Sequence, residues 1–82
     1  MIYAIAVFKT TFETLKAEDF FREEEITFRP VLKPRKIGSA CRMALRFDII
    51  DLDKAKQAVA KGGLHLQDFY RQDGDQWTKL EE

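Results

Sequence analysis

The sequence predicts an α+β sandwich of the ferredoxin-like βαββαβ type, in which two helices cover one face of a four-stranded antiparallel sheet. Strand-like and helix-like segments alternate in that order, and the two halves of the chain repeat a strand–helix–strand pattern. The 82 residues suffice for one small domain and leave no room for a second independent core. We assign residues 1–71 to this domain and residues 72–82 to a C-terminal tail or short extra strand.

The first half of the chain begins with a strand over Ile2–Phe8. This segment is apolar at nearly every position, which predicts that both of its faces are covered. A helix follows, and the hydroxyl of Thr10 or Thr11 can cap it by accepting from the first-turn N–H groups. The segment Ile26–Leu32 is a second strand. Pro30 predicts an edge position for this strand, because proline cannot donate to a sheet ladder.

The second half opens with a half-buried strand over residues 42–48, where apolar side chains alternate with basic or small ones. Asp51 is the predicted N-cap of a second helix, and the glycine pair 62–63 ends that helix. The fourth strand covers Leu64–Arg71. A turn then leads to Gln76–Leu80, which forms either the short extra strand or the tail.

Composition excludes several classes of protein. The chain has one cysteine, Cys41, and one histidine, His65, so an internal disulfide and a closed structural zinc site are both excluded. No apolar run is long enough for a membrane span, and the N-terminus lacks the basic start of a secretory signal. We therefore expect no metal, no membrane association and a cytoplasmic location, where a cysteine stays reduced.

Charge is balanced overall, with 14 basic and 14 acidic residues, but it is unevenly distributed. Six basic residues and no acidic residue lie between Arg29 and Phe47. Binding of an anion or an acidic partner and a merely solvated sheet face are both open explanations. Nucleic acid is not an expected ligand, because residues 42–48 lack the glycine and aromatic pattern of RNA-recognition strands and the net charge is zero.

Cys41 is the candidate for covalent chemistry. It lies between a loop containing Pro34 and Gly38 and the strand over residues 42–48. Nearby cations lower the pKa of a cysteine below its usual value of about 8.5, and the resulting thiolate is the form that attacks sulfur. Composition alone favours the competing interpretation. Cys41 has the strand parity of Leu45, and a buried cysteine often acts as a small apolar side chain.

The segment around Cys41 resembles the signature of the selenium/sulfur carrier-like proteins, a family of small bacterial domains. That signature has a Pro-Arg pair, an aliphatic residue, small residues leading into Cys-Gly, and then Ala-Leu-Arg. The matching residues in this chain are Pro34, Arg35, Ile37, Ser39, Cys41, Ala44, Leu45 and Arg46. The chain differs at Arg42, where the family has glycine, and at Gly38 and Ala40, which replace serines. Arg42 either adds positive charge beside the thiol or blocks close approach by a donor.

The resemblance implies a carrier or accessory protein rather than a turnover enzyme. In this scheme Cys41 holds a sulfur or selenium atom as a persulfide-type adduct, Ser39 hydrogen-bonds the sulfur, and no bound cofactor is needed. The implied partners are a donor protein such as a cysteine desulfurase and an acceptor protein. The residues expected to stabilise anionic forms, with Arg35 and Arg46 foremost, are Lys33, Arg35, Lys36, Arg42 and Arg46.

Two alternatives stay open at this point. The chain could be a non-catalytic module that binds an anion or a protein, with Cys41 as a structural residue. The apolar first strand also predicts a cover for the sheet face away from the helices. That cover is either a second copy of the chain, giving a homodimer, or the tail containing Trp77 and Leu80.

Overall fold

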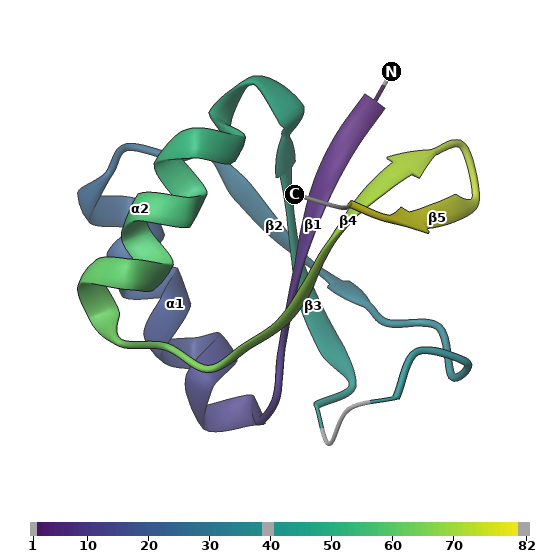
Figure 1. Cartoon of the computed structure of the whole chain (residues 1–82), viewed down its shortest axis with the longest axis horizontal. Coiled ribbons are helices and arrows are strands. Elements are labelled where there is room, and N and C mark those ends of the chain that lie inside the picture. The colour runs from purple at the N-terminus through teal and green to yellow at the C-terminus, as the bar shows by residue number, and fades with distance from the viewer. Residues whose placement is uncertain (1, 39–40, 81–82) are drawn as a thin grey trace.

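The computed structural model of the chain describes residues 2–38 and 41–80. Its elements follow the order βαββαββ (Figure 1). In chain order they are β1 (Ile2–Phe8), α1 (Thr11–Glu23), β2 (Phe28–Leu32), β3 (Met43–Asp48), a 3-10 turn (Ile49–Asp51), α2 (Leu52–Gly62), β4 (Leu66–Asp73) and β5 (Gln76–Lys79).

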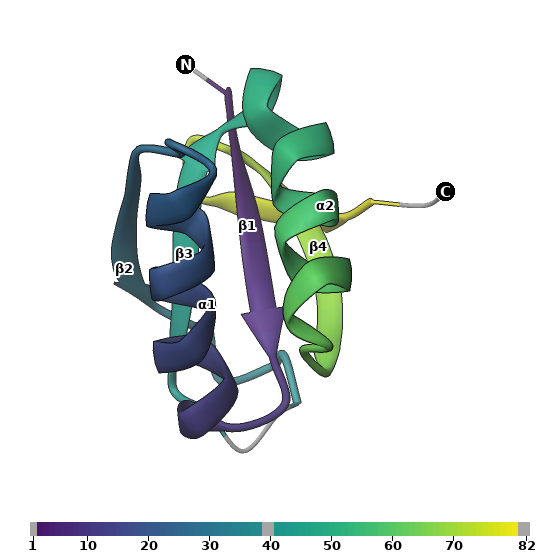
Figure 2. The same ribbon diagram turned by 90° about the vertical axis from the view of Figure 1, so that its left-hand side faces the viewer.

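The strands form one antiparallel sheet in the order β2-β3-β1-β4-β5. Both helices pack on one face of this sheet (Figures 1 and 2). The predicted ferredoxin-like fold is therefore confirmed, and the C-terminal segment adds a fifth strand. Pro30 lies in edge strand β2, as the missing N–H requires. Gly74, at φ 62°, lies in the turn that joins β4 to β5.

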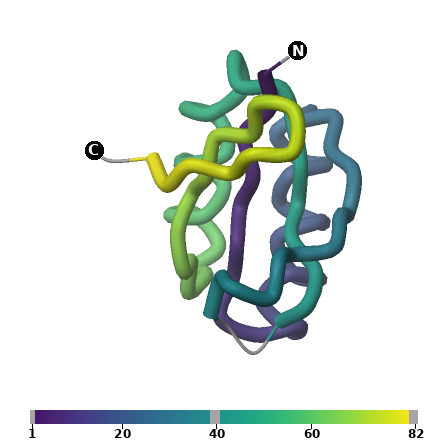
Figure 3. The backbone as a smooth tube through the Cα atoms, turned by 90° about the vertical axis from the view of Figure 1, so that its right-hand side faces the viewer, coloured from purple at the N-terminus to yellow at the C-terminus, as the bar shows by residue number. Residues whose placement is uncertain are grey.

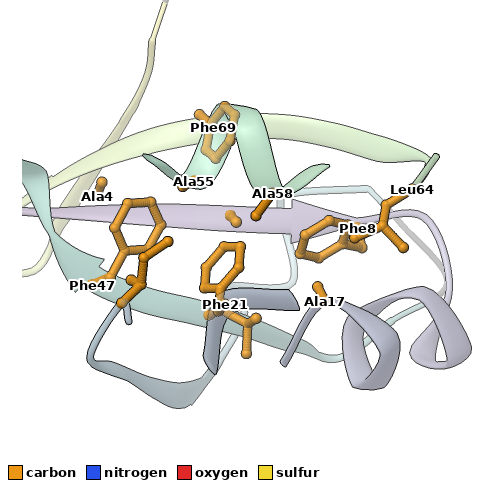
Figure 4. Packing of buried hydrophobic residues seen from close by; sticks show 12 residues of the cluster. Ala4, Phe8, Ala17, Phe21, Phe47, Ala55, Ala58, Leu64 and Phe69 are labelled. Carbon is orange, nitrogen blue, oxygen red and sulfur yellow. The ribbon is translucent and has the colours of Figure 1, made fainter. Parts of the chain in front are cut away.

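The main core lies between the sheet and the helices (Figure 4). Its centre is a group of phenylalanines in edge-to-face contact, with Phe21 and Phe47 ring centroids 5.4 Å apart and Phe47 and Phe69 centroids 6.4 Å apart. Small residues such as Ala17 and Ala58 let the helices approach this layer closely. The alternation in β3 follows the prediction, because Leu45 and Phe47 both point into this core.

A second, smaller apolar cluster covers the other face of the sheet. Ile5 and Val7 of β1 pack there with Ala44 and with Ile37, which comes from the segment after β2. Trp77 of β5 packs against the same cluster. Figure 3 shows the β4–β5 hairpin and the segment after β2 lying across β1 from this side. Both faces of β1 are thus covered within the chain, as predicted, whereas Leu80 packs against the main core instead.

The helix ends differ from the prediction at one point. Thr10 caps α1, and its hydroxyl accepts from the Glu13 N–H at 3.2 Å. Asp51, the predicted cap of α2, makes no side-chain cap hydrogen bond. Instead the Asp48 carboxylate accepts from the Ile50 N–H at 3.1 Å, because a 3-10 turn precedes the helix and needs the cap one turn earlier. Gly63 ends α2 at φ 59°, as predicted.

Candidate functional site

Cys41 lies just before β3, at the end of the sheet where α1 begins (Figure 2). Its side chain is 0% exposed. The sulfur faces α1, the same side to which Leu45 and Phe47 point further along the strand. The parity argument from the sequence therefore holds, and Cys41 is a buried residue on the helix side of the sheet.

Several polar groups lie within hydrogen-bond distance of the sulfur. The Thr14 hydroxyl oxygen lies 3.1 Å from Cys41 Sγ, and the Thr11 hydroxyl donates to the same sulfur at 3.7 Å. Thr14 is itself buried, the one buried polar side chain among the described residues. Cys41 Sγ also lies 3.2 Å from the carbonyl oxygen of Met43, to which a thiol donates. We call Thr11, Thr14 and Met43 together the hydroxyl cradle.

The cradle can serve both protonation states of Cys41. The Thr14 hydroxyl has a single proton, and its oxygen lies 3.1 Å from the Thr10 carbonyl as well as 3.1 Å from the sulfur. When Cys41 is a thiol, it can donate to the Met43 carbonyl while Thr14 donates to Thr10. When Cys41 is a thiolate, it only accepts, and the Thr14 proton can turn toward the sulfur.

The pKa of Cys41 is lowered from its ordinary value by this environment. Burial acts in the opposite direction and raises the pKa, because a charged sulfur loses its hydration. Hydrogen bonds with Thr14 and Thr11 lower the pKa, and the positive charge of Lys33 lowers it as well. The two hydroxyls belong to the first turn of α1, where the partial positive charge of the helix end also favours an anion.

The segment after β2 is folded against the sheet beside Cys41. The Lys33 N–H donates to the Arg42 carbonyl at 2.7 Å, which extends the pairing of β2 with β3 by one residue. The Lys33 ammonium donates to the Ile37 carbonyl, and the Ile37 N–H donates to the Pro34 carbonyl at 3.1 Å. These bonds and the buried Ile37 side chain hold the segment in place, with Lys33 close enough to act on the thiol.

The basic residues of the same segment form a separate feature. A hollow at the surface is lined by the charged residues Lys33, Arg35 and Arg42 and by Leu32, Ile37 and Gly38. Arg35, Arg42 and the neighbouring Lys36 are exposed. Ile37 packs with the cluster on the face away from the helices, whereas the Cys41 sulfur contacts α1. We call this feature the basic hollow; it and the thiol lie on different sides of this end of the sheet.

Arg46 lies apart from Cys41. Its guanidinium stacks over the Tyr3 ring, 4.4 Å from the ring centroid, in the part of the sheet where β1 begins. It lines a different hollow together with Arg29. Of the predicted site residues, the structure thus brings Lys33 to the thiol and gathers Arg35 and Arg42 on the outer side. Ser39 lies outside the described residues.

Sequence reasoning missed the residues that contact the sulfur most closely. Thr14 and Thr11 lie 27 and 30 positions from Cys41 along the chain. One signal pointed to them in part: Thr10 or Thr11 and Thr14 recur at helical spacing, so that hydroxyls share one side of the first turns of α1. That spacing indicates a polar face on the helix, but it does not say what the face contacts.

In the part of the chain that the structure describes, no helix is long and apolar enough to cross a membrane. Among residues 2–38 and 41–80, no group of three or more His, Cys, Asp or Glu side chains could hold a metal ion.

The comparisons with known proteins agree with the resemblance noted in the sequence. No curated protein and no solved structure matches the chain. One family does match, over residues 3–71, which run from the second residue of β1 through Cys41 to Arg71 in β4. On that match, the chain belongs to the family described as "Putative Se/S carrier protein-like".

Proposed function

We propose that this chain carries sulfur or selenium, with Cys41 holding the atom as a persulfide-type adduct and passing it to a partner protein. The observation that carries the proposal is the polar surrounding of a buried sulfur: hydroxyls at 3.1 and 3.7 Å and a pKa below the ordinary value. A cysteine that only fills the core is expected among apolar groups. Membership of the family supports the same role.

The transfer involves no net oxidation. The Cys41 thiolate attacks the outer sulfur of a donor persulfide, so that an S–S bond forms at Cys41 while the donor's S–S bond breaks and the donor leaves as a thiolate. In the second step an acceptor thiolate attacks the terminal sulfur, and Cys41 leaves as a thiolate. A lower pKa makes Cys41 a better leaving group, and it also raises the fraction of Cys41 that is ready to attack.

The proposal gives the described residues distinct roles. Thr14 and Thr11 donate to the anionic sulfur, and Lys33 supplies positive charge. The donor is a protein persulfide, such as that of a cysteine desulfurase, and the acceptor is a second protein. The roles expected from the sequence for Ser39 and Arg46 stay predictions.

Complete burial of Cys41 adds a condition to this mechanism. A donor sulfur reaches an atom that is 0% exposed only after the structure opens locally around it. The observed rate constant is then the intrinsic rate constant of the thiolate multiplied by the fraction of open molecules and by the fraction of thiolate. Measured reactivity must therefore be separated into these two parts before it is compared with that of other cysteines.

The same burial supports a second candidate function, a binding module in which Cys41 is structural. Cysteine is among the most buried residue types, and the basic hollow would then be the functional feature. The rate of Cys41 alkylation as a function of pH separates the two functions. Rapid labelling below neutral pH supports the carrier, whereas labelling that requires global unfolding supports the binding module.

The direct test is the intact mass of the protein after incubation with a cysteine desulfurase and cysteine. We expect a gain of one sulfur atom that a reductant removes. Cys41→Ala is the chemical control, and Cys41→Ser is the matched control that keeps the size of the side chain. Circular dichroism establishes that both variants fold.

A gain in mass that persists in both variants would contradict the role of Cys41, because the sulfur would then be bound elsewhere. No gain, from a desulfurase whose own persulfide is detected in the same sample, requires a second donor to be tried. Inorganic polysulfide serves for that purpose. Failure with both donors would contradict the carrier function and favour the binding module.

A further inference from the structure

The cations around the basic hollow come from a stretch of the chain, Arg29 to Phe47, that has no acidic residue. Arg22, Lys61 and Lys79 each form an ion pair with a carboxylate of the chain, at 3.1 to 3.5 Å. Within residues 2–38 and 41–80, the cations of the segment after β2 form none: Lys33, Arg35, Lys36 and Arg42. Their charge is therefore available to an anionic group from outside the chain.

Most of this charge does not act on the thiol. Lys33 is the cation of the described chain whose charge lowers the pKa of Cys41, while the Arg35 and Arg42 side chains are exposed. The hollow they line opens beside Ile37, which packs on the face of the sheet away from the helices. A cluster of like charges costs free energy through mutual repulsion, and a ligand that neutralises it removes that cost.

The hollow also has an apolar component. Ile37 lies within it, and Leu32 at its edge is 75% exposed. An exposed apolar side chain bordered by charge is typical of a surface that binds a protein.

We propose that the basic hollow docks an acidic segment of a partner protein, and that this segment places one large apolar side chain against Leu32 and Ile37. The inference deepens the proposed function and rests on it for the partner's role, because docking there brings a donor or acceptor to the end of the sheet where Cys41 lies. The observations favour a protein over a nucleic acid. Among the residues that the structure describes, no aromatic side chain lines the hollow for base stacking, and the chain has a net charge of zero.

The test is fluorescence anisotropy with a short fluorescein-labelled peptide of Glu and Ser residues around one central Leu. The double variant Arg35→Glu/Arg42→Glu should bind this peptide at least about tenfold more weakly than the wild-type chain. The matched control is Lys54→Glu/Arg71→Glu, which makes the same change of charge at exposed residues of α2 and β4. It should keep the affinity within about twofold. Replacing the central Leu by Ser should weaken binding to the wild-type chain by at least about fivefold.

Three outcomes would overturn this inference. Equal weakening in both double variants would mean that only overall charge matters. Equal or tighter binding of a single-stranded oligonucleotide of matched charge would assign the hollow to nucleic acid. A concentration-dependent dimer that Arg35→Glu/Arg42→Glu abolishes, seen by sedimentation, would assign it to a second copy of the chain. Failure of this inference can be distinguished from failure of the proposed function, because polysulfide loads Cys41 without a docked protein. A variant that loses peptide binding but is loaded normally by polysulfide is impaired only in docking.

Discussion

The hydroxyl cradle and the basic hollow lie at one end of the same small sheet, and they differ in nearly every physical property. In the cradle the sulfur and Thr14 are buried, and neutral hydroxyls hold the sulfur, one of them 3.1 Å away. The hollow is open to solvent and lined by cations that form no ion pair with the described chain. Most of the basic residues that flank Cys41 in the sequence therefore do not lower the pKa of its thiol; among the described residues, Lys33 is the one that does.

The two environments tune an anion with different strength. A hydrogen bond in a buried site is not screened by salt, and the low local dielectric constant strengthens it. The charge of an exposed guanidinium is screened within about 8 Å at physiological ionic strength. We therefore expect the chemistry of Cys41 to depend on two threonines more than on the arginines that flank it. The predictions below test that ranking, from the largest effect to the smallest.

Thr14→Val should cause the largest change in Cys41 reactivity. The substitution keeps the branched shape but removes the hydroxyl that lies closest to the sulfur and can donate to its thiolate. We expect the rate of alkylation by iodoacetamide near neutral pH to fall about tenfold, since a hydrogen bond to a charged group is worth about 1.5 kcal/mol. The measurement is the second-order rate constant across a pH series, with the free energy of unfolding determined in parallel.

Thr14→Ser is the matched control, because it keeps the hydroxyl and loses only a methyl group. Its rate should stay within about threefold of the wild-type rate. If the serine and valine variants slowed alkylation equally, Thr14 would act by packing alone. Its hydroxyl would then not stabilise the Cys41 thiolate.

The same contact shows where prediction from the sequence stops. The apolar run of β1, the alternation of Leu45 and Phe47 and the helix stop at Gly63 follow from local patterns, and the structure confirms them. The pairing of Thr14 with Cys41 is tertiary, because it depends on how α1 lies across β3. A local pattern could not reveal it, just as it could not reveal that a 3-10 turn moves the helix cap from Asp51 to Asp48.

The site illustrates a second limit. Residues next to Cys41 in the sequence are not all next to its sulfur, because side chains alternate along an extended chain. Arg42 and Arg46 have the opposite parity to Cys41, and Arg46 stacks on Tyr3. The parity of the strand therefore predicted the burial of Cys41 correctly, and the same parity places these two arginines away from its sulfur.

Lys33 links the two regions, and its removal should have an intermediate effect. Lys33→Met keeps the length of the side chain but loses the charge that lowers the pKa of Cys41. We expect the alkylation rate near neutral pH to fall about threefold, less than in Thr14→Val because a partly solvated charge is screened.

Lys33→Arg is the control, since it keeps a cation and a donor for the Ile37 carbonyl. The expected result is a rate close to that of the wild-type chain. A rise in rate for Lys33→Met would instead indicate that Lys33 acts chiefly by holding the segment after β2 closed, so that the open fraction outweighs the thiolate fraction.

The cradle should also affect stability in a pH-dependent way. The pKa of Cys41 in the folded state lies below its ordinary value of about 8.5, which applies to the unfolded chain. Between these two values the unfolded chain holds a proton that the folded chain lacks, so the free energy of unfolding rises with pH. The gain is complete above the unfolded-state pKa and is lost as the pH falls through the folded-state value.

Urea denaturation of the wild-type chain and of Cys41→Ala at a series of pH values measures this contribution. The difference between the two stabilities should increase as the pH rises through that window, because other titrating groups are common to both proteins. A difference that is constant with pH, or that shrinks as the pH rises, would mean that the folded structure does not favour the thiolate.

Arg35→Gln and Arg42→Gln should have the smallest effect on the reactivity of the Cys41 thiol. These variants therefore distinguish the hydroxyl cradle from the basic hollow. Both side chains are exposed, and their charges are screened from a sulfur that lies on the helix side of the sheet. We expect each substitution to change the alkylation rate of Cys41 by less than about twofold. The affinity for the acidic peptide should fall in the same proteins, so that one pair of variants leaves the cradle intact while it weakens the hollow. If the alkylation rate fell as far as in Thr14→Val, the arginines would act on the thiol directly, and the two regions would be one site.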